Sequence, residues 1–61
     1  MEISIHEVKR VETKLKLFNE FSILEITATD KEGREVKLSL FANDLENLTL
    51  HQKPVRVAYD R

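Results

Sequence analysis

The most constraining feature of this sequence is a turn signal, Asp30-Lys31-Glu32-Gly33, that lies between two alternating runs of apolar and polar residues. An Asp at the first turn position can accept hydrogen bonds from the backbone that follows it. Gly adopts the left-handed conformation at little cost. Together these residues predict a three-residue hairpin loop, a type I turn followed by a G1 bulge, in which Asp30 pairs with Arg34.

This pairing fixes the register of the strands on both sides of the loop. Side chains alternate along a strand, so three apolar pairs fall on one face of the hairpin. A shift by one residue would scatter these side chains over both faces, and the turn and the pattern therefore predict the same hairpin. Leu38 is expected in the core. The predicted pairs are Leu24 with Leu40, Ile26 with Leu38 and Ala28 with Val36.

A second hairpin is expected before the first one. Residues 11–18 alternate, and Asn19-Glu20 is then expected to form a two-residue turn, because Asn tolerates a positive φ. With that turn, the earlier strand adds to the same apolar face, and the chain forms a three-stranded antiparallel meander. The expected partners are Leu15 with Leu24, Thr13 with Ile26 and, on the other face, Lys14 with Glu25.

The ends of the chain are expected to add further elements. Residues 1–8 alternate weakly and predict a strand with a bend near His6. Asn43, with Glu46 three residues later, is typical of a capped start of a short helix. Pro54 then opens a last predicted strand over residues 55–59.

The expected fold class is therefore all-β with one short helix. It consists of a three-stranded meander with N- and C-terminal strands. This order resembles an SH3-like small barrel in layout, although the acidic loop and paired aromatic residues of peptide-binding SH3 domains are missing. An open sheet with a helix across one face is the competing architecture.

Length and composition bound the possible functions. The 61 residues are expected to form one complete domain over 1–61, without leader or linker, and so short a chain buries only about 60% of its unfolded surface. The chain has no Cys for a disulfide, so oligomerisation is the remaining common way to stabilise it. A net charge of −1 argues against nucleic-acid binding by bulk electrostatics. The lack of Cys and of long apolar runs favours a cytoplasmic protein without a membrane partner.

Three phenylalanines provide the most suggestive candidate site. They should gather with an isoleucine on the face away from the core, bordered by lysines. Three interpretations are open: a second core layer covered by a terminal strand, a subunit interface, or a ligand site in which rings stack on bases and lysines hold phosphates. The candidate residues are Phe18, Phe21, Ile23, Phe41, Lys14, Lys16 and Lys37.

Other polar residues indicate little chemistry. Arg56 is a candidate binder of phosphate or carboxylate, and Tyr59 is a candidate core residue or interface anchor. His6 and His51 lack the spacing of a metal site. The chain has one Gly and no Cys, and it shows no nucleophile elbow and no phosphate loop. We therefore expect neither an enzyme nor a cofactor.

Three functions remain. The first is a non-enzymatic, homo-oligomeric binding protein that holds a small nucleotide-like ligand or a protein partner. Short, Cys-free, charge-rich β proteins resemble accessory proteins of phages and prophages, some of which inhibit host defence by blocking a protein or sequestering nucleotide signals. The second function is single-stranded nucleic-acid binding through the Phe and Lys face. The third is a structural subunit of a larger assembly.

Overall fold

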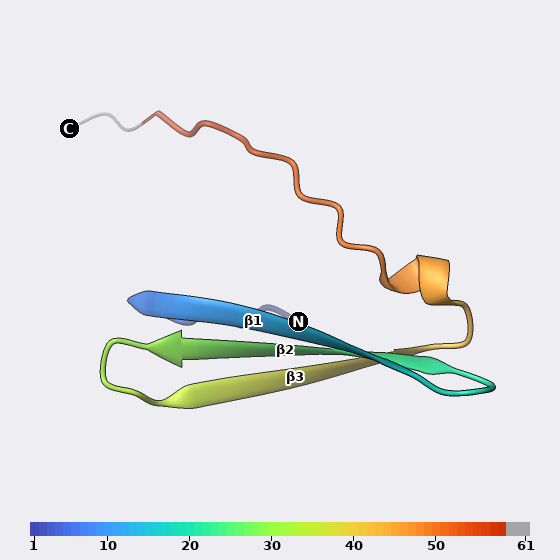
Figure 1. Ribbon diagram of the computed structural model, residues 1–61. Coiled ribbons are helices and arrows are strands. Elements are labelled where there is room, and N and C mark those ends of the chain that lie inside the picture. Colours follow the sequence, from blue (N-terminus) through green and yellow to red (C-terminus); the bar gives the residue numbers. More distant parts are fainter. Residues whose placement is uncertain (59–61) are drawn as a thin grey trace.

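The computed structural model describes residues 1–58, and three antiparallel strands within them form one open sheet (Figure 1). The strands are adjacent in chain order, with β2 in the centre. The predicted all-β meander is confirmed. Of the two architectures considered, the described residues form the open sheet, because β1 and β3 each pair only with β2. The strands are β1 (Val8–Leu17), β2 (Ser22–Asp30) and β3 (Glu35–Ala42).

Both hairpins have the register that the sequence predicts. Leu24 lies opposite Leu15 on β1 and opposite Leu40 on β3. The same alternation puts two different faces on the sheet. The apolar face carries Val11, Thr13, Leu15, Leu17, Ser22, Leu24, Ile26, Ala28, Val36, Leu38, Leu40 and Ala42. The mixed face carries Glu12, Lys14, Lys16, Ile23, Glu25, Thr27, Thr29, Glu35, Lys37, Ser39 and Phe41.

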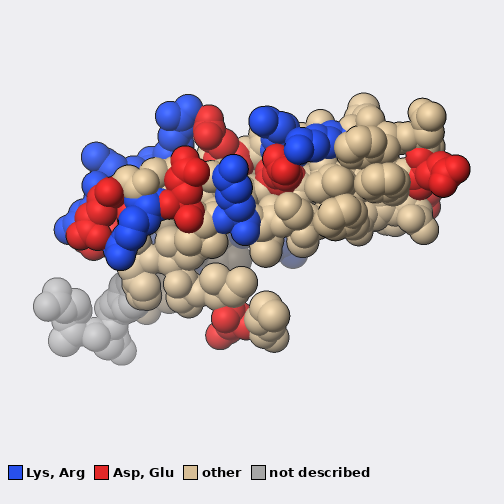
Figure 2. Space-filling view, turned by 90° about the horizontal axis from the view of Figure 1, so that it is seen from below, with Lys and Arg blue, Asp and Glu red and all other residues tan. Residues whose placement is uncertain are grey.

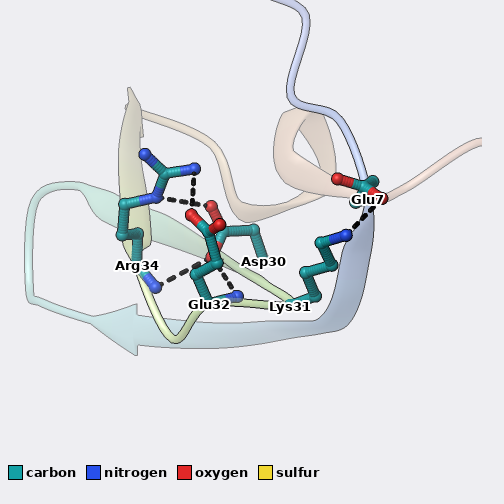
Figure 3. Close-up of polar contacts among 5 residues, drawn as sticks. All are labelled: Glu7, Asp30, Lys31, Glu32 and Arg34. Carbon is teal, nitrogen blue, oxygen red and sulfur yellow. Dashed lines mark hydrogen bonds and ion pairs between the residues drawn. The ribbon is translucent and has the colours of Figure 1, made fainter.

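The loop between β2 and β3 has the predicted geometry (Figure 3). The Gly33 N–H donates to the Asp30 carbonyl oxygen at 3.0 Å, and Gly33 has φ 85°. The Asp30 Oδ1 accepts from the backbone N–H groups of Glu32 and Arg34, each at 2.9 Å. The Arg34 Nε donates to Asp30 Oδ2 at 2.9 Å. These contacts close the loop and lower the pKa of Asp30, mainly through the Arg34 backbone N–H.

The N-terminal segment differs from the expectation. The predicted strand over residues 1–8 is wrong, because β1 begins only at Val8 and residues 1–6 have no regular structure. The bend expected near His6 falls at Glu7, which has φ 57°. The Glu7 carbonyl oxygen accepts from the Lys31 N–H at 3.1 Å, and the two side chains form an ion pair at 2.9 Å (Figure 3). The segment is therefore fastened to the β2–β3 loop instead of being paired as a strand.

The chain after β3 also departs from the expectation. In place of a capped helix there is one 3₁₀ turn, η1 (Leu45–Leu48). The N-cap residue is Asp44, not Asn43, and its side chain makes no capping hydrogen bond. The predicted C-terminal strand is not formed over residues 55–58, which have no regular structure, and Tyr59 lies outside the described residues. A strand needs a partner for its backbone groups, and these residues have none within the described sheet.

The core is small. Leu24 is 5% exposed, and Ala28 and Ser22 are also buried. The expectation that Leu38 lies in the core is wrong, because its side chain is 42% exposed. On the apolar face, Ile3 and Ile5 border a hollow with Ile26, Ala28, Val36 and Leu38, and η1 contacts β2 and β3. The radius of gyration is 14.7 Å, against about 10 Å for a compact domain of this length.

The Asp30 contacts predict an acid-dependent stability. The pKa of Asp30 is lowered in the folded chain. The contribution of Asp30 to folding stability is therefore fully present at pH values above the ordinary pKa of a carboxyl group, and it is lost as pH falls through the lowered pKa. Asp30→Asn should lower Tm at neutral pH, and the difference from the native chain should shrink as the solution is acidified. Thermal unfolding followed by circular dichroism over a pH series tests this. A Tm difference that stays constant at all pH values would contradict it.

Candidate functional site

The predicted cluster of phenylalanines is present at the end of the sheet that carries the β1–β2 turn. We call Phe18, Phe21, Ile23 and Phe41 the aromatic patch. The Phe18 N–H donates to the Phe21 carbonyl oxygen at 3.0 Å, which closes a two-residue loop over Asn19 and Glu20. This tight turn brings the first two rings together, with centroids 4.8 Å apart and planes 13° apart.

The third ring joins the patch through the β2–β3 register. Phe41 lies opposite Ile23, and its ring centroid is 6.2 Å from that of Phe21, at an interplanar angle of 20°. The rings of the patch remain in water, since Phe18 is 50% and Phe41 68% exposed. A second core layer, covered by a terminal strand, is therefore not what the described residues form.

The three predicted lysines share the mixed face with the patch. Lys16 lies in the same cross-strand row as Ile23 and Phe41. Its Nζ forms an ion pair with Glu25 Oε2 at 3.1 Å. Lys14 lies directly opposite Glu25, as expected, but the ion pair forms with the diagonal neighbour. The Lys16 hydrogen bond, together with the charges of Lys14 and Lys37, lowers the pKa of Glu25.

Carboxylates lie among these lysines on the mixed face and offset their positive charge. A shallow groove of about 270 Å³ crosses the mixed face beside the patch. Figure 2 shows this face, with acidic and basic side chains interspersed over one part of the sheet and mostly uncharged residues toward the β1–β2 turn, apart from acidic atoms at the tip. The mixture of signs gives the groove no strong preference for an anion. Its lining residues are Glu12, Thr13, Lys14, Glu25, Thr27, Glu35 and Lys37.

The other candidate residues do not join this site. Arg56 is exposed in the segment that follows η1, outside the sheet that carries the patch. Tyr59 lies outside the described residues. His6 and His51 are both exposed. Across residues 1–58, no three side chains of the His, Cys, Asp and Glu types gather as metal ligands would.

Sequence reasoning missed a second surface, the uncovered part of the apolar face. Its large side chains were expected in the core, yet many are exposed. The available signal was the shortness of the chain, because so few residues rarely cover both faces of a sheet. The exposed members of this face are Val11, Leu15, Leu17, Val36, Leu38 and Leu40.

Within residues 1–58, the structure contains no helix with the length and apolar character needed to cross a membrane. The comparisons with known proteins give the chain no family. It matches no protein-family model, no curated protein and no solved structure.

Proposed function

We propose that this protein is a non-enzymatic binding module that holds a protein partner on the aromatic patch and acts as a homo-oligomer. The observation that carries this proposal is the row of stacked, exposed phenylalanine rings at one end of a charged sheet face. Contiguous apolar patches bordered by charge on small proteins usually mark interaction sites.

The charge pattern around the patch favours a protein as the partner. Protein interfaces combine an aromatic-rich centre with a polar rim of both charge signs. The patch supplies the aromatic centre, and the groove beside it supplies Lys14 and Lys37 together with Glu12, Glu25 and Glu35. A ligand made of phosphates would meet these carboxylates as well as the lysines.

The exposed surface supports a homo-oligomer. The chain has an accessible surface of 6128 Å², whereas a compact monomer of this mass has about 4100 Å². The buried hydrophobic residues of the described chain are Leu24 and Ala28 alone, which is little for an independently stable domain. Association with further copies would remove part of this surface from water.

A second candidate function is the binding of nucleotide-like ligands or single-stranded nucleic acid. Three nearly parallel rings with lysines on the same face favour it, since bases stack on aromatic side chains. The Lys16–Glu25 ion pair, which occupies one of the lysines, counts against it.

The finer role proposed here is that of an accessory protein of the phage or prophage type, which inhibits host defence by blocking a protein. Its support is size, composition and layout.

Native mass spectrometry of the protein expressed in a bacterium tests the proposal, because it reports subunit number and bound molecules together. We expect a closed oligomer at micromolar concentration, without a nucleotide mass attached. A single subunit over the whole concentration range would contradict the homo-oligomer. Binding of an oligonucleotide that weakens steeply with salt would instead support the second candidate.

A further inference from the structure

We propose that residues 53–58 of one copy add as a strand to the β3 edge of a second copy, with Val55 and Val57 over the apolar face of that copy. The exchange is reciprocal, so each copy gives one segment and receives one. This inference rests on the homo-oligomer proposed above and names the surfaces that form it.

The donated segment has the pattern of a strand but no partner strand among the described residues of its own chain. Val55 and Val57 alternate with Arg56 and Ala58, and Pro54 stands at the position where a strand tolerates a missing donor. Both valines are largely exposed. In Figure 1 the segment leaves η1 and diverges from the sheet, on the side opposite to the charged face seen in Figure 2. Its apolar side chains therefore lie on the side of the sheet that has uncovered apolar surface.

The receiving edge is β3. Its outer backbone groups have no partner strand within the described sheet, and its register runs from Glu35 to Ala42 without a shift. An unpaired, regular edge is a template for a further strand. The other edge is less suitable, because β1 has a bulge between Val8 and Arg10, and bulges at an edge hinder pairing.

The side chains on β3 match those of the segment. Val36, Leu38 and Leu40 lie on the apolar face and are each about two-fifths exposed. A strand paired with β3 would place Val55 and Val57 beside them while Arg56 points to the mixed face, where the charged residues are.

The area agrees with a dimer of this kind. The excess of about 2000 Å² over a compact monomer is more than the roughly 800 Å² that each partner buries in a standard interface. Reciprocal exchange uses the same two surfaces on each copy around a two-fold axis, so the assembly closes at two subunits.

Two matched double variants of the full chain test the exchange. V55S with V57S removes the apolar side chains of the segment, whereas R56S with A58S changes the alternate positions and keeps the valines. We expect a dimer for the native chain and the control. For the valine variant we expect a dissociation constant raised at least about 10⁴-fold, since reciprocal exchange buries four valines and each contributes the equivalent of about a ten-fold change or more. Analytical ultracentrifugation over a concentration series measures this.

A second measurement identifies the contact itself. In a mixture of isotope-labelled and unlabelled copies, isotope-filtered NMR should show contacts between the Val57 methyl groups of one copy and the β3 leucines of the other. An equally tight oligomer in the valine variant, together with no such contacts in the native chain, would overturn the exchange and leave the homo-oligomer standing. A native chain that is monomeric at every concentration would overturn both.

Discussion

Leu24→Ala should unfold this protein at temperatures where the native chain is folded. Leu24 is the most buried large side chain of the described residues and lies in the central strand, between Leu15 and Leu40. Truncation of a buried leucine costs about 2–5 kcal/mol. A domain of 61 residues has a total stability of about 3–9 kcal/mol. The measurement is urea unfolding followed by circular dichroism.

Leu17→Ala is the matched control for this experiment. Leu17 is on the same face at the end of β1 and is 64% exposed, so its truncation should cost about 0.5 kcal/mol or less. Both variants are compared at one protein concentration, because the stability of an oligomer depends on concentration. Equal losses of unfolding free energy in Leu24→Ala and Leu17→Ala would show that the core is not centred on β2.

Phe41→Ala should weaken binding of the protein partner about 30-fold while the fold is retained. Phe41 is 68% exposed, and among the described residues its ring stacks only on Phe21, so the substitution should lower the stability of the free chain by roughly 0.5–1.5 kcal/mol. Aromatic residues at the centre of an interface typically contribute about 2 kcal/mol or more to binding. The measurement is the affinity for the protein captured by the native chain, with circular dichroism as the check of folding.

Leu17→Ala again serves as the control, because Leu17 is about as exposed as Phe41 but lies on the opposite face. The partner should bind this variant as tightly as the native chain. If Phe41→Ala bound its partner normally, the aromatic patch would not be the binding surface. A loss of fold in Phe41→Ala would instead place the ring in the core of the assembled protein.

The two hairpins could be predicted because their causes are local. The Asp30 side chain and the positive φ of Gly33 close one loop, and the alternation on both sides of it allows one register. The aromatic patch followed from the same register, because Phe41 could only lie opposite Ile23. The ion pair of Glu25 could not be assigned in this way. Lys14 and Lys16 are both within reach of it, and rotamers choose between the direct and the diagonal neighbour.

The terminal segments show where local reasoning stops. Residues 1–8 alternate weakly and residues 55–58 alternate clearly, yet residues 1–7 and 55–58 form no strand in the described chain. A strand is not stable by itself, because half of its backbone hydrogen bonds belong to a neighbour. Periodicity therefore indicates which face a segment can bury, but not whether an edge is available to pair with it. The predicted short helix is replaced by a 3₁₀ turn for a related reason, since a helix of only two turns depends on packing for its stability.

The amino-acid sequence by itself determined the order of the three strands, their register and the two chemically different faces of the sheet. Only the tertiary structure decided that several large side chains of the apolar face stay exposed among the described residues, that Glu7 binds the β2–β3 loop, and that residues 49–58 lie outside the sheet. Turn chemistry and side-chain alternation act between near neighbours in the chain. Coverage of a face depends on how much chain is left to cover it, and 61 residues leave too little.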